Sequence, residues 1–116
     1  MKKKNFLVTG GTGFIGIGIC KLLIKLGHNV TIFDNNSRGK ISRISEFGKK
    51  VKFIKADIRN KKKVFSSLKN IDAVIHLAYI NGTKFFYEKP ELILDVAVKG
   101  LINIFDGKIL ITNHDW

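Results

Sequence analysis

The sequence has a single cysteine and no long apolar run, and these two absences exclude an internal disulfide and a membrane-spanning helix. It contains one cysteine, Cys20, among 116 residues, so no internal disulfide can form. Cys20 lies in an apolar helical stretch, which favours a buried structural thiol over a reactive one. No apolar run approaches the roughly 20 residues that span a bilayer, and too few apolar residues follow the basic start for a signal peptide. We therefore expect a soluble, cytoplasmic protein with no membrane partner.

Acidic residues are also scarce, which leaves a formal net charge of +12. Such a charge is compatible with nucleic acid, an anionic membrane surface or a phosphorylated ligand as partner. However, arginine, the better reader of bases, occurs only at Arg38, Arg43 and Arg59. The aromatic residues are not interleaved with the basic runs as they would be in a stacking platform. A solvated, lysine-rich surface is the favoured interpretation, and nucleic-acid binding stays open as an alternative.

Histidines are few and scattered, and this argues against a metal site. His28, His76 and His114 have no cysteine or carboxylate at ligand spacing, so we expect no metal. His76 is flanked by apolar residues, and a hydrogen-bonded core histidine is favoured there over a catalytic base.

Apolar runs alternate with helical patterns along the whole chain. Strands are predicted over residues 5–8, 29–33, 51–55, 72–77 and 108–112, and helices over 14–26, 41–47, 61–68 and 90–105. Strands that alternate with helices at this spacing form right-handed crossovers and a parallel sheet. The strand runs are continuously apolar, as expected when helices cover both faces of the sheet. The fold class is therefore α/β, a doubly wound parallel sheet in one domain over residues 1–116, ending at about the fifth strand.

Glycines recur at the junction of the first strand and the first helix. Gly10, Gly13 and Gly16 have the spacing G-x-x-G-x-x-G. By the logic of Rossmann-type turns, Gly10 permits the tight exit from the strand, Gly13 lets a pyrophosphate approach the backbone, and Gly16 lets the helix pack near the sheet. Unpaired N–H groups at the helix start favour a diphosphate. A purely structural turn is the alternative, and the strand–turn–helix context favours the dinucleotide site.

Asp34 stands at the end of the second predicted strand. A carboxylate there accepts both hydroxyls of the adenosine ribose and repels a 2′-phosphate, which favours NAD over NADP as cofactor. Arg38 nearby is a counter-argument, because arginine pairs with a 2′-phosphate. A plain turn role for Asp34 is the other alternative.

Four blocks, residues 9–16, 34–39, 55–59 and 72–78, stand in one order within residues 5–106. Together they resemble the extended short-chain dehydrogenases/reductases, specifically the NAD-dependent nucleotide-sugar epimerases and dehydratases. The opening Thr9–Gly16 stretch is similar to the family's TGGTGFIG, and residues 34–39 to its ribose loop D-N-x-S-x-G. Residues 55–59 resemble its G-D-I-R segment, and residues 72–78 its D-x-V-x-H-L-A-A strand.

The resemblance implies a cofactor-binding role for particular residues. It assigns the pyrophosphate to the backbone of Phe14 and Ile15, and the adenine to Asp57, which would accept from the amino group, and to Ile58, which would pack on the ring. The adenosine ribose would contact Asp34, Asn35, Asn36 and Ser37, and the nicotinamide-side ribose would contact Leu77, Ala78 and Tyr79. Helix N-cap and strand-entry roles are the alternatives for Asp57 and Asp72, and for Asp72 we favour the structural role.

The chain also departs from the family pattern. Ala97 and Leu101 replace the asparagine and threonine of N-V-x-G-T, and neither Tyr79 nor Tyr87 begins the catalytic Tyr-x-x-x-Lys. We therefore expect no catalytic residues here, and we expect the chain to be a fragment produced by truncation, frameshift or a split gene. A nucleotide-sugar substrate is expected only in a full-length form, which in this family is often a homodimer. Apolar sheet edges would be left uncovered, so a marginally stable domain is expected. A non-catalytic NAD-sensing module is the second hypothesis.

Overall fold

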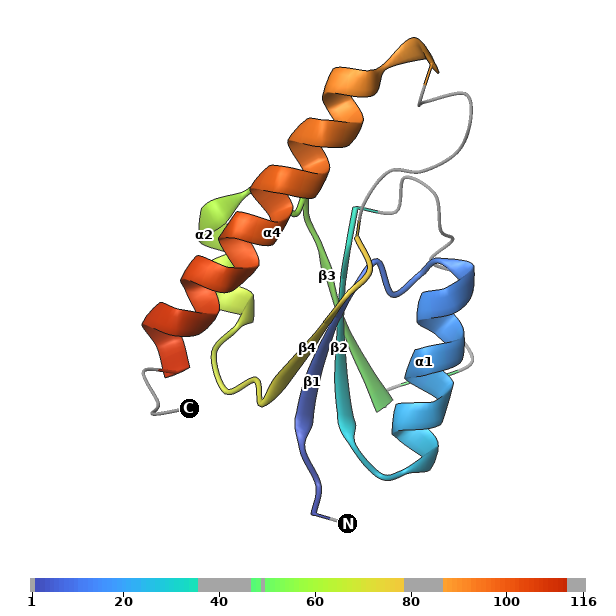
Figure 1. The fold of residues 1–116 in the computed structure, drawn as a ribbon. Helices are drawn as coiled ribbons and strands as arrows, with labels where there is room; N and C mark the ends of the chain where they lie inside the picture. Colours follow the sequence, from blue (N-terminus) through green and yellow to red (C-terminus); the bar gives the residue numbers. More distant parts are fainter. Residues whose placement is uncertain (1, 36–46, 49, 79–86, 113–116) are drawn as a thin grey trace.

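A computed structural model describes residues 2–35, 47–48, 50–78 and 87–112, with side chains described as far as residue 108. Its elements are β1 (Asn5–Thr9), α1 (Phe14–Lys25), β2 (Asn29–Asp34), β3 (Val51–Lys55), α2 (Lys61–Ser67), β4 (Ala73–His76) and α4 (Pro90–Thr112). The strands form one parallel sheet in the order β3-β2-β1-β4. Helix α1 lies on one face of this sheet, and α2 and α4 lie on the other (Figure 1). The predicted doubly wound α/β fold is confirmed.

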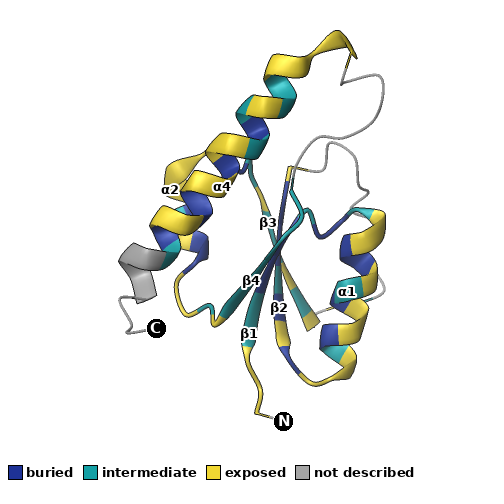
Figure 2. Ribbon diagram, in the orientation of Figure 1, coloured by how far each residue is buried: buried dark blue, intermediate teal, exposed yellow. Residues whose placement is uncertain are grey.

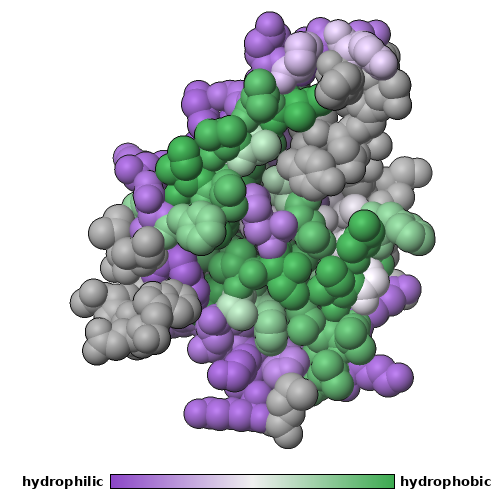
Figure 3. All heavy atoms as spheres, viewed as in Figure 1, coloured by the Kyte–Doolittle hydropathy of each residue, from purple (hydrophilic) through white to green (hydrophobic). Residues whose placement is uncertain are grey.

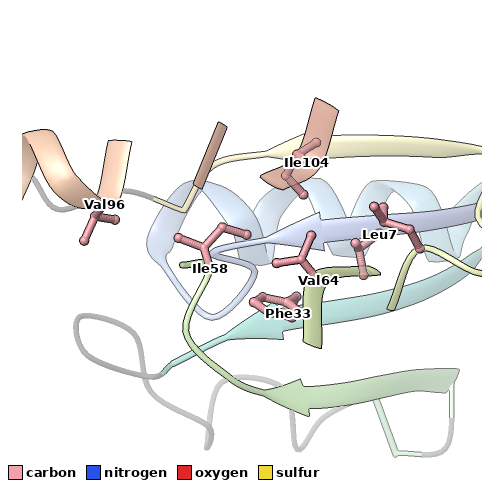
Figure 4. Close-up of a cluster of buried hydrophobic side chains, with 7 residues drawn as sticks. Leu7, Phe33, Ile58, Val64, Val96 and Ile104 are labelled. Carbon is pink, nitrogen blue, oxygen red and sulfur yellow. The ribbon is translucent and has the colours of Figure 1, made fainter. Parts of the chain in front are cut away.

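Each face of the sheet has its own apolar cluster, because alternate residues of a strand point to opposite faces. Leu7 of β1 packs under α2 and α4 in a cluster shown in Figure 4, whereas its neighbour Val8 packs under α1 with Cys20. Buried positions follow the helix faces turned to the sheet (Figure 2). The central strands are therefore buried on both sides, which explains their continuous apolar runs.

Helix α1 ends within one residue of its predicted end and is followed by a glycine in the left-handed region. Gly27 has φ +89°. Its N–H donates to the Ile24 carbonyl, and the His28 N–H donates to the Leu23 carbonyl at 3.0 Å. These two bonds form a Schellman motif, which satisfies the last carbonyls of the helix and turns the chain into β2.

The fifth strand predicted over residues 108–112 is wrong, because α4 continues through this segment. Gly107, directly before it, lies inside the helix where α4 crosses α2. A Cβ on Gly107 would lie 2.7 Å from Leu68 Cδ1 and 2.8 Å from Phe65 Cδ1. The glycine thus permits a close helix crossing rather than ending a helix, and a short apolar run after it cannot distinguish strand from helix. The helix predicted over 41–47 lies outside the described residues except for Phe47.

One face of α4 is apolar and exposed. Figure 3 shows apolar residues gathered over this helix and across the neighbouring sheet. The exposed side chains recur at helical spacing and are Leu94, Val98, Leu101, Ile102 and Phe105. None of the helices in the described part of the chain is long and apolar enough to cross a membrane.

Candidate functional site

The glycine loop, residues 10–16, leaves the carboxyl end of β1 and begins α1. Gly10 has φ +72°, and its N–H donates to the Phe33 carbonyl of β2 at 2.8 Å. A Cβ at this position would lie 3.0 Å from the backbone of Leu77 and Ala78, beyond the end of β4. Gly10 therefore gives the tight strand exit that its spacing predicts, in a conformation that other residues seldom adopt.

Gly16 is required for a different reason from the one its spacing suggests. A Cβ there would lie 2.5 Å from the Gly10 carbonyl oxygen and 2.7 Å from Gly11 Cα, so the first turn of α1 packs against the loop itself. The close approach to the sheet belongs instead to Gly11, where a Cβ would lie 2.7 Å from Ile32 Cγ2 of β2. The glycine spacing assigns no role to Gly11. The one feature of the sequence that could have indicated its role is its position between Gly10 and Gly13.

The first turn of α1 presents backbone N–H groups at the carboxyl edge of the sheet. Gly13 is the N-cap residue and has no side chain with which to cap them, and the first turn holds no acidic residue. Among the described residues, a Cβ on Gly13 would have only the Gly10 carbonyl oxygen within 4 Å, at 3.3 Å. The Phe14 and Ile15 side chains are exposed. This arrangement leaves room for an anion against the N–H groups of the first turn.

Asp34 ends β2 directly beside this loop. Its Oδ2 accepts hydrogen bonds from the Thr12 backbone N–H at 3.0 Å and from the Thr12 hydroxyl at 2.7 Å. Both residues are buried. The carboxylate therefore fastens the loop to the neighbouring strand, which is more than the plain turn role that was its alternative. Asn35 follows it and is exposed, whereas Asn36, Ser37 and Arg38 lie outside the described residues.

The acidic loop, residues 56–60, follows β3 at the same edge of the sheet. The Ala56 N–H donates to the Asp34 carbonyl at 3.1 Å, so this loop begins next to the end of β2. Asp57 Oδ1 accepts from the Arg59 backbone N–H at 2.9 Å, and its Oδ2 accepts from the guanidinium at 2.8 Å. The Arg59 hydrogen bonds hold the pKa of Asp57 below its ordinary value. Asn60, and not Asp57, caps α2, by accepting from the Lys63 N–H at 3.1 Å.

Ile58 requires a correction. Its side chain is only 4% exposed and belongs to the apolar cluster under α4, where a Cβ on Gly100 would lie 2.8 Å from Ile58 Cγ2. The buried Asn103 amide donates to the Ile58 carbonyl at 3.1 Å. The side chain thus packs in the core and does not face a ligand as the expected packing on adenine would require, because α4 covers it.

The end of β4 lies on the other side of β1. Thr9 Oγ1 is 2.7 Å from His76 Nδ1 and accepts from the Leu77 and Ala78 N–H groups. Two accepted bonds leave the hydroxyl proton to be donated to the His76 ring nitrogen. Burial lowers the pKa of His76, so the ring is neutral near pH 7. His76 is therefore hydrogen-bonded as predicted, but it is half-buried and not in the core. The Thr9 hydroxyl holds Leu77 and Ala78 next to it, and Tyr79 lies outside the described residues.

The matches to known proteins agree with this geometry. A family model described as "NAD dependent epimerase/dehydratase family" covers residues 6–107. The chain belongs to this NAD-dependent epimerase/dehydratase family. Its N-terminal motifs predict the same membership.

Individual relatives of the family match most of this chain. It is 36% identical over 107 residues to a UDP-N-acetyl-alpha-D-glucosaminuronate decarboxylase of Bacillus cytotoxicus, with 92% of this chain and 33% of the relative covered. It is 38% identical over 104 residues to a UDP-glucose 4-epimerase of Klebsiella pneumoniae, covering 84% of this chain and 75% of that one. The chain spans about a third of the length of the Bacillus relative and of several other curated relatives.

Solved structures of the family show the same fold. A Thermus thermophilus UDP-glucose 4-epimerase in complex with NAD is 32% identical and has a TM-score of 0.79, covering 89% of this chain and 33% of that one. A Stenotrophomonas maltophila UDP-glucose-4-epimerase with bound NAD and formylated UDP-arabinopyranose is 28% identical and has a TM-score of 0.86, covering 95% and 34% respectively.

Two residues that the sequence analysis considered for chemistry, Cys20 and Asp72, have structural roles. Cys20 is fully buried, and burial raises the pKa of its thiol to about 11. Asp72 accepts from the Asn5 N–H at 2.7 Å and so joins the start of β4 to β1, as its structural interpretation predicted. Within residues 2–35, 47–48, 50–78 and 87–112, no three His, Cys, Asp or Glu side chains are grouped to hold a metal ion.

Proposed function

We propose that this chain binds NAD along the carboxyl edge of its sheet. The observation that carries the proposal is the glycine loop, in which three glycines bring the first turn of α1 against the ends of β1 and β2 while Gly13 leaves the helix start uncapped. The helix dipole favours a diphosphate there by only about 0.3–1 kcal/mol per charge at an exposed site. Direct hydrogen bonds from the N–H groups of Phe14 and Ile15 would supply the larger share.

The residues on either side of the loop fit the two ends of the dinucleotide. Asp34, with Asn35, Asn36 and Ser37 after it, would hold the adenosine ribose, and its negative charge disfavours the 2′-phosphate of NADP. Asp57 would accept from the adenine amino group. Beyond β4, the family resemblance assigns the ribose on the nicotinamide side to Leu77, Ala78 and Tyr79. The residues present therefore fit NAD without a further charged group.

Within these 116 residues the chain would bind the cofactor without turning it over. Neither Tyr79 nor Tyr87 is followed by lysine at the fourth position, because Thr83 and Glu91 stand there. Bound NAD supplies hydride transfer in this family, and a tyrosine–lysine pair supplies the proton transfer that accompanies it. Epimerisation or dehydration of a nucleotide sugar would require residues outside this sequence.

Calorimetric titration of the purified chain with NAD and with NADP tests the proposal. We expect saturable binding of NAD, and binding of NADP weakened at least about tenfold by Asp34, an amount that corresponds to one unfavourable charge interaction. The matched variants are Gly13→Ala and Gly18→Ala. Gly13 has an ordinary extended backbone (φ −73°), so alanine is tolerated there but occupies the space of the diphosphate. A Cβ on Gly18 would have no atom of the described part of the chain within 4 Å, so this variant serves as the control.

The outcome is decided by comparing the two variants with the original chain. Loss of NAD binding in the Gly13 variant, with its melting temperature preserved and binding by the Gly18 variant intact, would support the proposed site. A folded original chain that gives no heat of association with NAD would refute it.

A further inference from the structure

Arg59 is held from two sides by carboxylates that are far apart in the sequence. Its Nε and Nη2 atoms donate to the two oxygens of Asp57, at 3.1 Å and 2.8 Å, in a side-on fork. Its Nη1 atom donates to Asp95 Oδ2 on α4 at 2.7 Å. A planar guanidinium bound on two edges has a fixed orientation, which a lysine ammonium in its place would not have.

Helix α4 fixes the far end of this arrangement. Asp95 Oδ1 is bound by Lys99 Nζ at 2.8 Å, one helical turn along, so charges alternate in the order Asp57, Arg59, Asp95, Lys99. Asn103 and Gly100 of the same helix contact Ile58 in the middle of the acidic loop. The loop is thereby held by α4 both at its backbone and through its arginine.

The exposure of these three side chains argues that their ion pairs orient the Asp57 carboxylate more than they stabilise the fold. The side chains of Arg59, Asp57 and Asp95 are 34%, 38% and 31% exposed. Ion pairs this accessible to water contribute little to folding stability. A carboxylate that is partly exposed at the ligand edge and gripped along one side can still present an acceptor in one defined direction.

We propose that Arg59 and Asp95 are positioning residues that orient the Asp57 carboxylate toward the amino group of the adenine base, and so make the chain selective for an aminopurine dinucleotide. This inference rests on the proposed NAD site and extends it to base selectivity. Helix α4, on the far side of the acidic loop, then contributes to ligand choice through Asp95 without contacting the ligand.

The test compares NAD with nicotinamide hypoxanthine dinucleotide, in which the amino donor is replaced by a carbonyl acceptor. The measured quantity is the ratio of the two dissociation constants, because a merely structural defect changes both constants together. In the original chain we expect the hypoxanthine compound to bind about tenfold more weakly, since a carbonyl facing the Asp57 carboxylate leaves both acceptors unpaired.

Three variants distinguish the effect of the Arg59 orientation on this ratio from effects of its charge and of folding. Asp95→Ala and Arg59→Lys should each reduce the ratio to about threefold or less, the first by freeing the guanidinium and the second by removing its fork while keeping its charge. Asp106→Ala removes an exposed carboxylate from the same helix and should leave the ratio unchanged. If Asp95→Ala unfolds, Arg59→Lys decides the question.

Two failures can be told apart. Absence of NAD binding by the original chain refutes the proposed function and this inference with it. NAD binding that discriminates against the hypoxanthine compound equally in the original chain, Asp95→Ala and Arg59→Lys refutes the positioning role alone, as does NAD binding with no discrimination at all.

Discussion

The glycine loop after β1 and the acidic loop after β3 meet at the same edge of the sheet, but they are held there by different means. The glycine loop is shaped by its own backbone, which packs against itself at Gly16 and against β2 at Gly11. The acidic loop is held by side chains of α4, through Asp95, Asn103 and the packing of Ile58. The first arrangement leaves no room for a Cβ at Gly11 or Gly16, whereas the second depends on side chains that a substitution can remove without a steric clash.

Substitution of Gly16 is expected to have the largest effect. In Gly16→Ala the new methyl group meets the backbone at 2.5 Å, where no side-chain rotation can relieve the contact. We expect a loss of about 3 kcal/mol in the free energy of unfolding, at the upper end of overpacking effects. In the control Gly18→Ala, on the same helix and in open space, we expect a gain of about 0.5–1 kcal/mol from helix propensity.

Urea denaturation of the two variants checks this prediction. Equal midpoints for Gly16→Ala and Gly18→Ala would show that the glycine loop can yield, and the contrast between the two loops would then disappear.

Removal of the Thr12 hydroxyl is expected to have an intermediate effect. Thr12→Val keeps the shape of the side chain but deletes the buried hydrogen bond to Asp34 Oδ2. A bond to a charged acceptor contributes about 1.5–3 kcal/mol, and we expect a loss in that range. Thr12→Ser retains the hydroxyl and should lose less than half as much by the same urea measurement. A valine variant as stable as the serine variant would mean that the backbone N–H alone fastens the loop.

The same contrast explains what could be predicted from the sequence. Gly10, Gly13, Gly16 and Asp34 lie within two neighbouring elements, so their spacing alone places them around one turn. The parallel sheet and the covering of both its faces by helices follow from the alternation of strands with helices. These parts of the site depend on local pattern, and the structure contains them where they were expected.

The contacts that were missed join distant parts of the chain. Asp95 lies 36 residues after Arg59, and no spacing rule pairs the two. The burial of Ile58 and the role of Gly107 both depend on where α4 crosses the rest of the molecule, which periodicity does not give. Asn60 was the exception, because an asparagine directly before the helical pattern at Lys61 is a local N-cap signal.

The smallest expected effect is on the pH dependence of stability, in which the end of β4 beside the glycine loop and the acidic loop respond at different pH. Near the glycine loop, burial lowers the pKa of His76, so the unfolded chain binds more protons than the folded one below its ordinary pKa of about 6.5. The free energy of unfolding should therefore rise with pH up to about 6.5 and level off above it. In the acidic loop, hydrogen bonds from Arg59 lower the pKa of Asp57. That contribution is complete above about pH 4 and is lost as the pH falls through the lowered pKa.

The free energy of unfolding measured between pH 3 and 8 should thus show two separate limbs, each reduced by a different variant. His76→Gln keeps a hydrogen-bonding side chain beside Thr9 but cannot titrate, and it should flatten the limb near pH 6 alone. Arg59→Gln removes the donors that lower the pKa of Asp57 and should reduce the limb below pH 4 alone. Part of that limb should remain, because Lys99 also lowers the pKa of Asp95. If either variant flattened both limbs, the two loops would form one coupled unit, and the difference in how they are held would have no energetic consequence.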